Sequence, residues 1–239
     1  MKPASDSHRA TLGAVAQKII GCRDCQRLTD YCGRVAREKK RAHRDDEYWG
    51  RPVPGFGDPL ARILLVGLAP AAHGANRTGR PFTGDGTMGS ANFLTAALHR
   101  AGLANQPTST SRDDGLALRD VFVSMAVRCA PPDNKPFPEE IQRCRRHFDA
   151  ETACLPNLKV VVALGQVAFD AWLRLSRERG QPVTPKPAFG HDEVVAMGPG
   201  QPTLIGCYHP SRQNTNTGKL TPSMLDDVMR RAKSLARRP

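Results

Sequence analysis

Residues 61–69 read ARILLVGLA, a short and almost wholly apolar run with a glycine near its end. This composition is typical of a strand that is buried on both faces of a parallel sheet. Three further runs of this kind alternate with helical patterns along the chain, at residues 120–129, 158–165 and 202–211. The alternation predicts an α/β fold, a three-layer α/β/α sandwich with a mostly parallel central sheet.

The spacing of apolar residues predicts the helices that cover this sheet. Helical patterns occupy residues 9–22, 90–103, 138–155, 166–180 and 222–238. The stretch 31–58 is dense in charge and then in proline and glycine, which predicts an exposed arm with little regular sheet. We therefore expect one domain over residues 1–239, with an N-terminal helix and charged arm at 1–58 and a basic C-terminal helix at 222–239.

The charge of the chain is strongly basic. Its 239 residues include 35 Lys and Arg against 23 Asp and Glu, for a formal net charge of +12. This excess favours a polyanionic partner, although a genome rich in G and C also raises the arginine content. No apolar run reaches 18 residues, and the N-terminus lacks the pattern of a signal peptide. We expect a cytoplasmic protein with no membrane partner.

Four of the seven cysteines are spaced in a way that suits a metal site. Cys22 and Cys25 form a C-x2-C pair, Cys129 follows an expected strand, and Cys144 lies on the next expected helix. Four thiolates suit either tetrahedral zinc or an iron-sulfur cluster. The proline-rich loop between Cys129 and Cys144 favours a bulky cluster, but the spacing leaves both open. The other three are interpreted as core or incidental thiols: Cys32, Cys154 and Cys207.

Two unusual loops follow the expected strands. Residues 67–85 read GLAPAAHGANRTGRPFTGD, which contains neither the G-K-[ST] of a phosphate-binding P-loop nor a G-x-G-x-x-G pattern. Residues 208–222 read YHPSRQNTNTGKLTP and place His209 directly after a strand. Parallel sheets bind ligands at the carboxyl ends of their strands, so we expect the two loops to share one site.

The residues 67–85, 127–136 (VRCAPPDNKP) and 209–222 occur in this order, together with the four cysteines. Over about residues 20–230 the chain resembles the uracil-DNA glycosylase superfamily and, among its branches, family 5, the type-B iron-sulfur enzymes. The resemblance implies an enzyme that extrudes a deaminated base from double-stranded DNA and hydrolyses its N-glycosidic bond without lyase chemistry. It also implies a monomer near the prokaryotic nucleoid and a 4Fe-4S cluster on Cys22, Cys25, Cys129 and Cys144.

The same resemblance implies roles for individual residues. Phe82 would stack on the extruded base, and His209 would donate a hydrogen bond to the base oxygen as negative charge develops there. The pocket mouth would be lined by Gly67, Ala69, Pro70 and Ala71. The segment 212–220 would enter the groove beside the lesion. The expected DNA contacts are Arg77, Arg80, Ser211, Arg212, Gln213, Asn214 and Lys219.

The sequence departs from the superfamily pattern at two positions. Many relatives carry Asp, Glu or Asn where this chain has Ala69, so the attacking water lacks an obvious base. Asn76 and Asp85 are the candidates to position it: Asn76 is expected nearer the pocket mouth, and Asp85 can also accept a proton. Some relatives place an Asn at the position of Met125, where it pairs with the uracil edge. A thioether cannot do so, which predicts a permissive pocket that also accepts hypoxanthine and xanthine.

A different class of function accounts for part of these features. A non-catalytic iron-sulfur or zinc module that binds nucleic acid explains the basic charge and the cysteines. It does not explain two unusual loops at the ends of neighbouring strands. Phe82 as a core residue, and Asn76 and Asp85 as turn or helix caps, are the corresponding structural alternatives.

Overall fold

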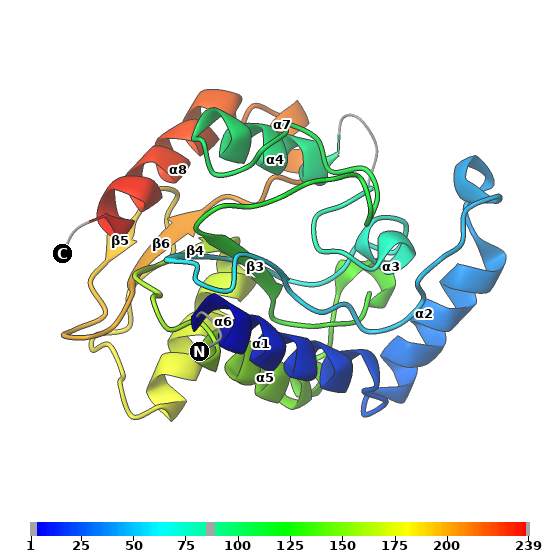
Figure 1. Ribbon diagram of the computed structural model, residues 1–239, viewed down its shortest axis with the longest axis horizontal. Coiled ribbons are helices and arrows are strands. Elements are labelled where there is room, and N and C mark those ends of the chain that lie inside the picture. The colour runs from blue at the N-terminus through cyan, green and yellow to red at the C-terminus, as the bar shows by residue number, and fades with distance from the viewer. Residues whose placement is uncertain (1–3, 85–88, 238–239) are drawn as a thin grey trace.

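A six-stranded sheet forms the centre of the protein in the computed structural model, which describes residues 4–84 and 89–237 (Figure 1). The strand order is β1-β3-β2-β4-β6-β5. The four central strands are parallel, and the two edge strands are antiparallel to their neighbours. The strands are β1 Phe56–Gly57, β2 Ile63–Gly67, β3 Val121–Met125, β4 Val160–Leu164, β5 Val194–Val195 and β6 Thr203–Cys207.

Alternate residues of the central strands pack into two separate cores. Ile63 and Leu65 of β2 lie in the core beneath α4 (Ser90–Arg100) and α8 (Pro222–Ala236). Leu64 and Val66 lie in the core on the other face. Because both faces of β2 are covered, its sequence is an unbroken apolar run and not an alternating one.

Three further helices cover the second face of the sheet. Helices α5 (Pro138–Ala153) and α6 (Gln166–Glu178) contribute Phe148, Phe169 and Trp172 to its core. Helix α1 (Ala4–Ile20) lies against α5. Figure 1 shows α4 and α8 on one side of the sheet and α1, α5 and α6 on the other. The expected three-layer α/β/α sandwich with a mostly parallel sheet is confirmed.

The register of the sheet brings the strand ends together at one edge. Gly67, the last residue of β2, pairs with Met125, the last residue of β3. Leu164, the last residue of β4, pairs with Cys207, the last residue of β6. The loops that follow these four strands therefore leave the sheet at a common edge, as the sequence predicts.

The N-terminal region is more ordered than an exposed arm. Helix α2 (Gln26–Glu38) buries Leu28, Cys32 and Val35, which lie on one face because they are spaced by three or four residues. The density of charged residues on the opposite face hides this pattern in the sequence. The remaining short helices are the 3-10 turns Arg41–His43 and Pro132–Asn134, with α3 (Ala75–Thr78) and α7 (Arg212–Asn216).

The segment after α2 is attached to α3. Asp46 forms an ion pair with Arg77 at 2.5 Å, and the backbone N–H of Trp49 donates to the carbonyl of Arg77 at 2.8 Å. The N–H of Gly50 donates to the carbonyl of Asn76 at 3.0 Å. Residues 46–50 thus form a fixed support for the first loop of the site.

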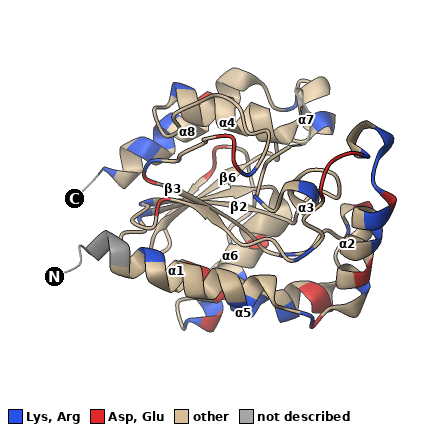
Figure 2. Ribbon diagram, turned by 45° about the vertical axis from the view of Figure 1, so that its right-hand side comes forward, with Lys and Arg blue, Asp and Glu red and all other residues tan. Residues whose placement is uncertain are grey.

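Basic residues lie along α2 and the segment that follows it, and again along α8 (Figure 2). The two groups are on opposite sides of the molecule in this view. Among residues 4–84 and 89–237, no helix is both long enough and apolar enough to cross a membrane.

Candidate active site and cysteine cluster

A cavity of about 60 Å³ lies at the carboxyl ends of the central strands. Its walls come from the loop after β2, the end of β3, the start of α4 and the loop after β6. Its lining residues are Ala69, Ala71, Gly74, Ala75, Phe82, Thr83, Ser90, Met125 and His209. The two loops singled out in the sequence therefore meet in one site.

Phe82 is held in a strained backbone conformation at this cavity. Its φ is 44°, in the left-handed region that residues other than glycine seldom adopt. A Cβ atom at Gly67 would lie 2.9 Å from the Phe82 ring, so the ring needs a glycine at the end of β2. The ring is half-buried, and Met125 is buried beneath it at the end of β3. An aromatic face on a cavity wall suits a planar ligand.

His209 faces Phe82 across the cavity and is kept neutral by its surroundings. Burial lowers the pKa of His209 to about 4. The connection between β4 and α6 lies beside His209: its Gly165 has a φ of 99°, which favours glycine, and the Gly165 N–H donates to the carbonyl of Cys207 at 2.8 Å. A neutral imidazole near pH 7 offers one N–H donor to a ligand oxygen, without the cost of desolvating a cation.

Of the two residues expected to position a water, the structure describes one, Asn76, and it is not at the cavity wall. Asn76 is fully buried, and its Nδ2 donates to the carbonyls of Cys32 at 3.4 Å and Ala72 at 3.3 Å. It lies behind the wall and does not line the cavity. Asp85 lies outside the described residues. Ala69 does line the cavity, as expected for the position that lacks a carboxylate.

Two expected phosphate contacts have internal partners. Arg80 is 3% exposed and binds the carboxylate of Asp114 at 2.7 Å, together with the hydroxyls of Thr83 and Ser109. The expectation that Arg80 contacts DNA directly is therefore corrected, since this side chain is used to hold the loop. Arg77 is mostly buried and forms its ion pair with Asp46.

The second loop forms the short helix α7. Ser211 caps this helix by accepting a hydrogen bond from the N–H of Asn214 at 3.3 Å. The Nδ2 of Asn214 donates to the carbonyl of His209 at 2.8 Å, which ties the helix to the cavity. Arg212, Gln213 and Lys219 are exposed. Their expected contacts with DNA stay a prediction.

Some cavity residues were missed in the sequence. Thr83 and Ser90 bring hydroxyls to the lining, and Gly74 and Ala75 form the wall at the start of α3. Thr83 follows Phe82 directly in the first loop, which is a usable signal. Ser90 opens a helix that reads as purely structural, so nothing in the sequence marks it. Pro70 is buried in the loop but does not line the cavity.

A second, much smaller cavity of about 20 Å³ is lined by the four expected cysteines. Cys22 follows α1, Cys25 caps α2, Cys129 follows β3, and Cys144 lies on α5. All four thiols are free. The short segment 22–25, the loop after β3 and helix α5 therefore bring their cysteines to the wall of one cavity.

Basic groups surround these sulfur atoms. The backbone N–H of Arg128 donates to Sγ of Cys144 at 3.2 Å, and Nη2 of Arg146 donates to Sγ of Cys22 at 3.6 Å. Burial raises the pKa of Cys144 to about 11. The pKa of Cys129 is also raised, mainly by its hydrogen-bonding interaction with Cys32 and to a lesser extent by burial. Such thiols ionise only when a positive group compensates for the lost hydration.

The four cysteines that line this cavity are the donor set that a thiolate-bound group would use. Within the described parts of the chain, no three Cys, His, Asp or Glu side chains are grouped closely enough to hold a single metal ion. His147 also lines the cavity, and its buried Nε2 has no hydrogen-bond partner among the described residues. Cys32 is a buried thiol in the same apolar cluster as Cys129 and Cys144, and its Sγ donates to the carbonyl of Ala130 at 3.6 Å.

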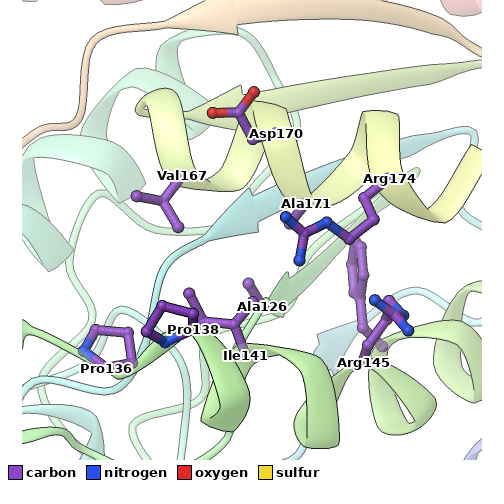
Figure 3. Close-up of a pocket in the computed structure, with 10 residues that line it drawn as sticks. Ala126, Pro136, Pro138, Ile141, Arg145, Val167, Asp170, Ala171 and Arg174 are labelled. Carbon is purple, nitrogen blue, oxygen red and sulfur yellow. The ribbon is translucent and has the colours of Figure 1, made fainter.

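An apolar cavity that is larger than the one at the strand ends lies between α5 and α6 (Figure 3). It has a volume of about 250 Å³, and Ile141, Val167 and Ala171 supply part of its lining. Its charged neighbour Arg145 pairs with Glu178 at 2.5 Å. The cavity contains none of the expected site residues. We place the candidate active site in the smaller cavity because it lies at the strand ends and is lined by both the Phe82 ring and the neutral imidazole of His209.

Comparison with known proteins gives a consistent result. The model of the family described as Uracil DNA glycosylase superfamily matches residues 54–233, which include the loops after β2 and β6. A Type-5 uracil-DNA glycosylase of Mycobacterium bovis is 51% identical over 219 residues, 91% of this chain and 79% of that protein. One of Thermus thermophilus is 49% identical, over 93% of this chain and 97% of that protein. A Type-4 uracil-DNA glycosylase of Thermotoga maritima is 30% identical, over 78% and 83%.

Proposed function

The chain belongs to the uracil DNA glycosylase superfamily and, within it, to the type-5 enzymes, and from this premise we propose a monofunctional DNA glycosylase. The enzyme extrudes a deaminated base from double-stranded DNA and hydrolyses the bond between the base and the deoxyribose in base excision repair. The observation that carries the proposal is the pairing of Phe82 with a neutral His209 in one cavity at the strand ends.

Extrusion of the base comes first. A base within the duplex stack is out of reach of any cavity, and unstacking it costs a few kcal/mol. Stacking on the ring of Phe82 offsets part of that cost. The close approach of this ring to Gly67 leaves the opposite face for the base.

Bond cleavage is assisted by His209. As the glycosidic bond breaks, negative charge develops on the base oxygen, and the imidazole N–H donates a hydrogen bond to it. A neutral donor is consistent with the pKa of about 4. The sugar then carries positive charge, and water adds to it.

The water has two candidate positioning residues, Asn76 and Asp85. The burial of Asn76 behind the cavity wall argues against it, because its Nδ2 already donates to two carbonyl groups. We therefore favour Asp85, whose carboxylate can both orient water and stabilise the positive sugar. With Ala69 on the wall, the main contribution of the protein is the stabilisation of the departing base.

The pocket accepts more than uracil. Met125 is buried at the end of β3 and lines the cavity, where it presents a thioether to the base edge. Because this group makes no strong hydrogen bond, the pocket selects for shape and stacking, and it also admits hypoxanthine and xanthine. Release of uracil alone from duplexes that carry each of the three bases would disprove this.

The four cysteines hold a 4Fe-4S cluster. Their free thiols on one cavity, the N–H donors to Cys22 and Cys144 and the nearby arginines support a thiolate-bound group of net negative charge. Through Cys22, Cys25, Cys129 and Cys144, the chain between α1 and α2, the loop after β3 and helix α5 would all be held to such a cluster. Visible absorbance of the purified protein that is lost in a Cys144→Ser variant supports the cluster. Bound zinc in a protein without visible absorbance would show that the four cysteines form a zinc site instead.

The protein works as a single domain over residues 1–239. We propose a monomer in the cytoplasm of a prokaryote, in contact with the nucleoid and with no membrane partner. Sedimentation of the purified chain, with and without a DNA duplex, tests the monomeric state.

A labelled duplex with one uracil tests the proposed function. Strand scission that requires alkali after incubation indicates a monofunctional glycosylase, because the abasic site is left intact. Retained binding of DNA without scission would instead support a non-catalytic nucleic-acid-binding module. A His209→Ala variant is the control, since contaminating activity would be unaffected by it.

A further inference from the structure

Most arginines near the cavity are neutralised within the protein. Arg77 pairs with Asp46, Arg80 with Asp114, and Arg128 with Glu151. These side chains stabilise the loops, and their charge is largely cancelled. The arginines that remain without a carboxylate are therefore the ones that matter for an anionic ligand.

Arg51 and Arg112 remain without such a partner, and both lie on one tryptophan. Their guanidinium carbons are 4.3 Å and 4.5 Å from the centre of the Trp49 ring. Both side chains are exposed, and within residues 4–84 and 89–237 neither forms an ion pair. Two like charges held on one ring repel each other, so an anion between or beside them is favourable.

Trp49 is itself rigidly placed. Its backbone N–H donates to the carbonyl of Arg77, and its Nε1 donates to the carbonyl of Pro52 at 3.1 Å. A Cβ atom at Gly79 would lie 2.7 Å from the indole, so the ring lies close against the backbone of that loop. The guanidinium groups of Arg51 and Arg112 therefore rest on a fixed ring and lose little conformational freedom when they bind an anion. We call Trp49 with these two arginines the platform.

The platform is joined to the active-site cavity on both sides. Trp49 packs against the core cluster of Val53, Ala75 and Met125, and the last two of these residues line the cavity. The carbonyl of Arg112 accepts a hydrogen bond from Arg80 at 3.1 Å, and Arg80 binds the cavity residue Thr83. A ligand bound by the platform therefore lies at the rim of the same site.

We propose that Arg51 and Arg112, held on Trp49, bind backbone phosphates of the DNA strand next to the extruded nucleotide. This inference rests on the proposed function, which supplies duplex DNA as the substrate. Guanidinium groups suit phosphate oxygens through paired hydrogen bonds, and phosphate contacts fix the position of a protein on DNA. The platform takes the role that the sequence suggests for Arg77 and Arg80.

The salt dependence of DNA binding tests the proposal. A variant with Arg51→Gln and Arg112→Gln is compared with the intact chain on an undamaged duplex across a range of salt concentrations. A plot of log affinity against log salt concentration has a negative slope, and loss of two phosphate contacts makes it shallower by about 1.8, since each contact contributes about 0.9. An unchanged slope overturns the proposal.

The matched control changes two other arginines. Arg174 and Arg177 on α6 are also exposed and, in the described parts of the chain, also lack a carboxylate partner. Helix α6 starts at the strand end that carries the site and runs back toward the opposite edge of the sheet, so these residues lie far from the cavity. The variant with Arg174→Gln and Arg177→Gln has the same net charge as the variant with Arg51→Gln and Arg112→Gln. The salt dependence of its DNA binding should match that of the intact chain. A drop equal to that of the platform variant would show a general charge effect only.

Tryptophan emission gives a second readout. The chain has two tryptophans, and Trp172 is a buried residue of α6 with no partner for its Nε1 among the described residues. In a Trp172→Phe variant the emission reports Trp49 alone, and it should change when undamaged duplex DNA binds. Addition of Arg51→Gln and Arg112→Gln should abolish most of this change. DNA binding without any change in Trp49 emission would overturn the proposal.

The two proposals fail separately. Binding of duplex DNA that depends on Arg51 and Arg112, without release of uracil, removes the glycosylase function and leaves the phosphate site in place. Release of uracil, together with an unaltered salt slope in the variant with Arg51→Gln and Arg112→Gln, removes the phosphate site and leaves the glycosylase function in place.

Discussion

The rings of Phe82 and His209 lie 5.9 Å apart between centroids and are tilted by 33°. One ring comes from the loop after β2 and the other from the loop after β6, so the cavity exists only when both loops are folded. Within the proposed function, Phe82 holds the base and His209 stabilises it as it leaves. This division of roles leads to different expectations for the two side chains.

His209→Ala is expected to lower the single-turnover rate of uracil release by about 10²–10³-fold, the usual effect of losing one donor to a developing negative charge. Phe82→Ala should cost about 10–100-fold, mainly through weaker binding of the base. Asn76→Ala and Asp85→Ala should each cost less than His209→Ala. A larger loss for either of these two would show that positioning of the water, and not stabilisation of the departing base, dominates the rate.

The pH dependence of the rate follows from the state of His209. Burial lowers its pKa to about 4, below the value near 6.5 of an unburied histidine. The neutral form therefore persists from pH 8 down to about pH 5, and single-turnover rates should show no decline at pH 6.5 that is due to this residue. Activity should fall only as the pH falls through about 4. A decline near pH 6.5 that disappears in His209→Gln would contradict a neutral donor.

Gly67→Ala should damage the cavity without unfolding the sheet. The added Cβ atom would meet the Phe82 ring at 2.9 Å and push it toward the space for the base. Misplacement of a binding group by about 1 Å can cost 100-fold in rate, so we expect a loss of about 10–100-fold at little change in melting temperature. Gly13→Ala on α1 is the matched control, since a Cβ atom there meets nothing within 4 Å. An active Gly67→Ala enzyme would show that the ring can move at no cost.

Glu151→Gln should strongly destabilise the protein. Its carboxylate pairs with Arg128 at 2.8 Å, and both side chains are almost completely buried. Removal of one charge leaves the guanidinium of Arg128 buried without a counter-ion, which costs about 3–5 kcal/mol in the free energy of unfolding. Asp227→Asn removes one partner of the exposed pair with Arg230 and should cost about 1 kcal/mol or less. Urea denaturation of the two variants checks the contrast.

The fold could be predicted because its strands are buried on both faces. The run 61–69 contains no polar residue apart from Arg62, and such a sequence is typical of a parallel strand covered on both faces. Helix α2 was missed as a buried element because Cys32 and Val35 are embedded among charged residues that cover its outer face. Periodicity identifies an amphipathic helix less reliably when the apolar stripe is this narrow.

The site could be predicted in part. Its loops were recognised because they follow strands whose ends lie together, and the four cysteines were found by their spacing. The positions of the Arg80 and Asn76 side chains could not be predicted, because their partners are distant in the sequence. Arg80 binds the carboxylate of Asp114, and Asn76 donates to the carbonyl of Cys32. Charge alone does not distinguish an arginine that binds a ligand from one that holds a loop.

The attachment of residues 46–50 to α3 has a practical consequence for the design of shortened proteins. The match to the superfamily model begins at residue 54, and a shortened protein could be designed to start there. Such a cut removes Asp46, Trp49 and Gly50, and with them the bonds that hold the backbone of Arg77 and Asn76. A protein shortened in this way would therefore keep the cavity residues but lose the segment that holds α3, one wall of the cavity, in place.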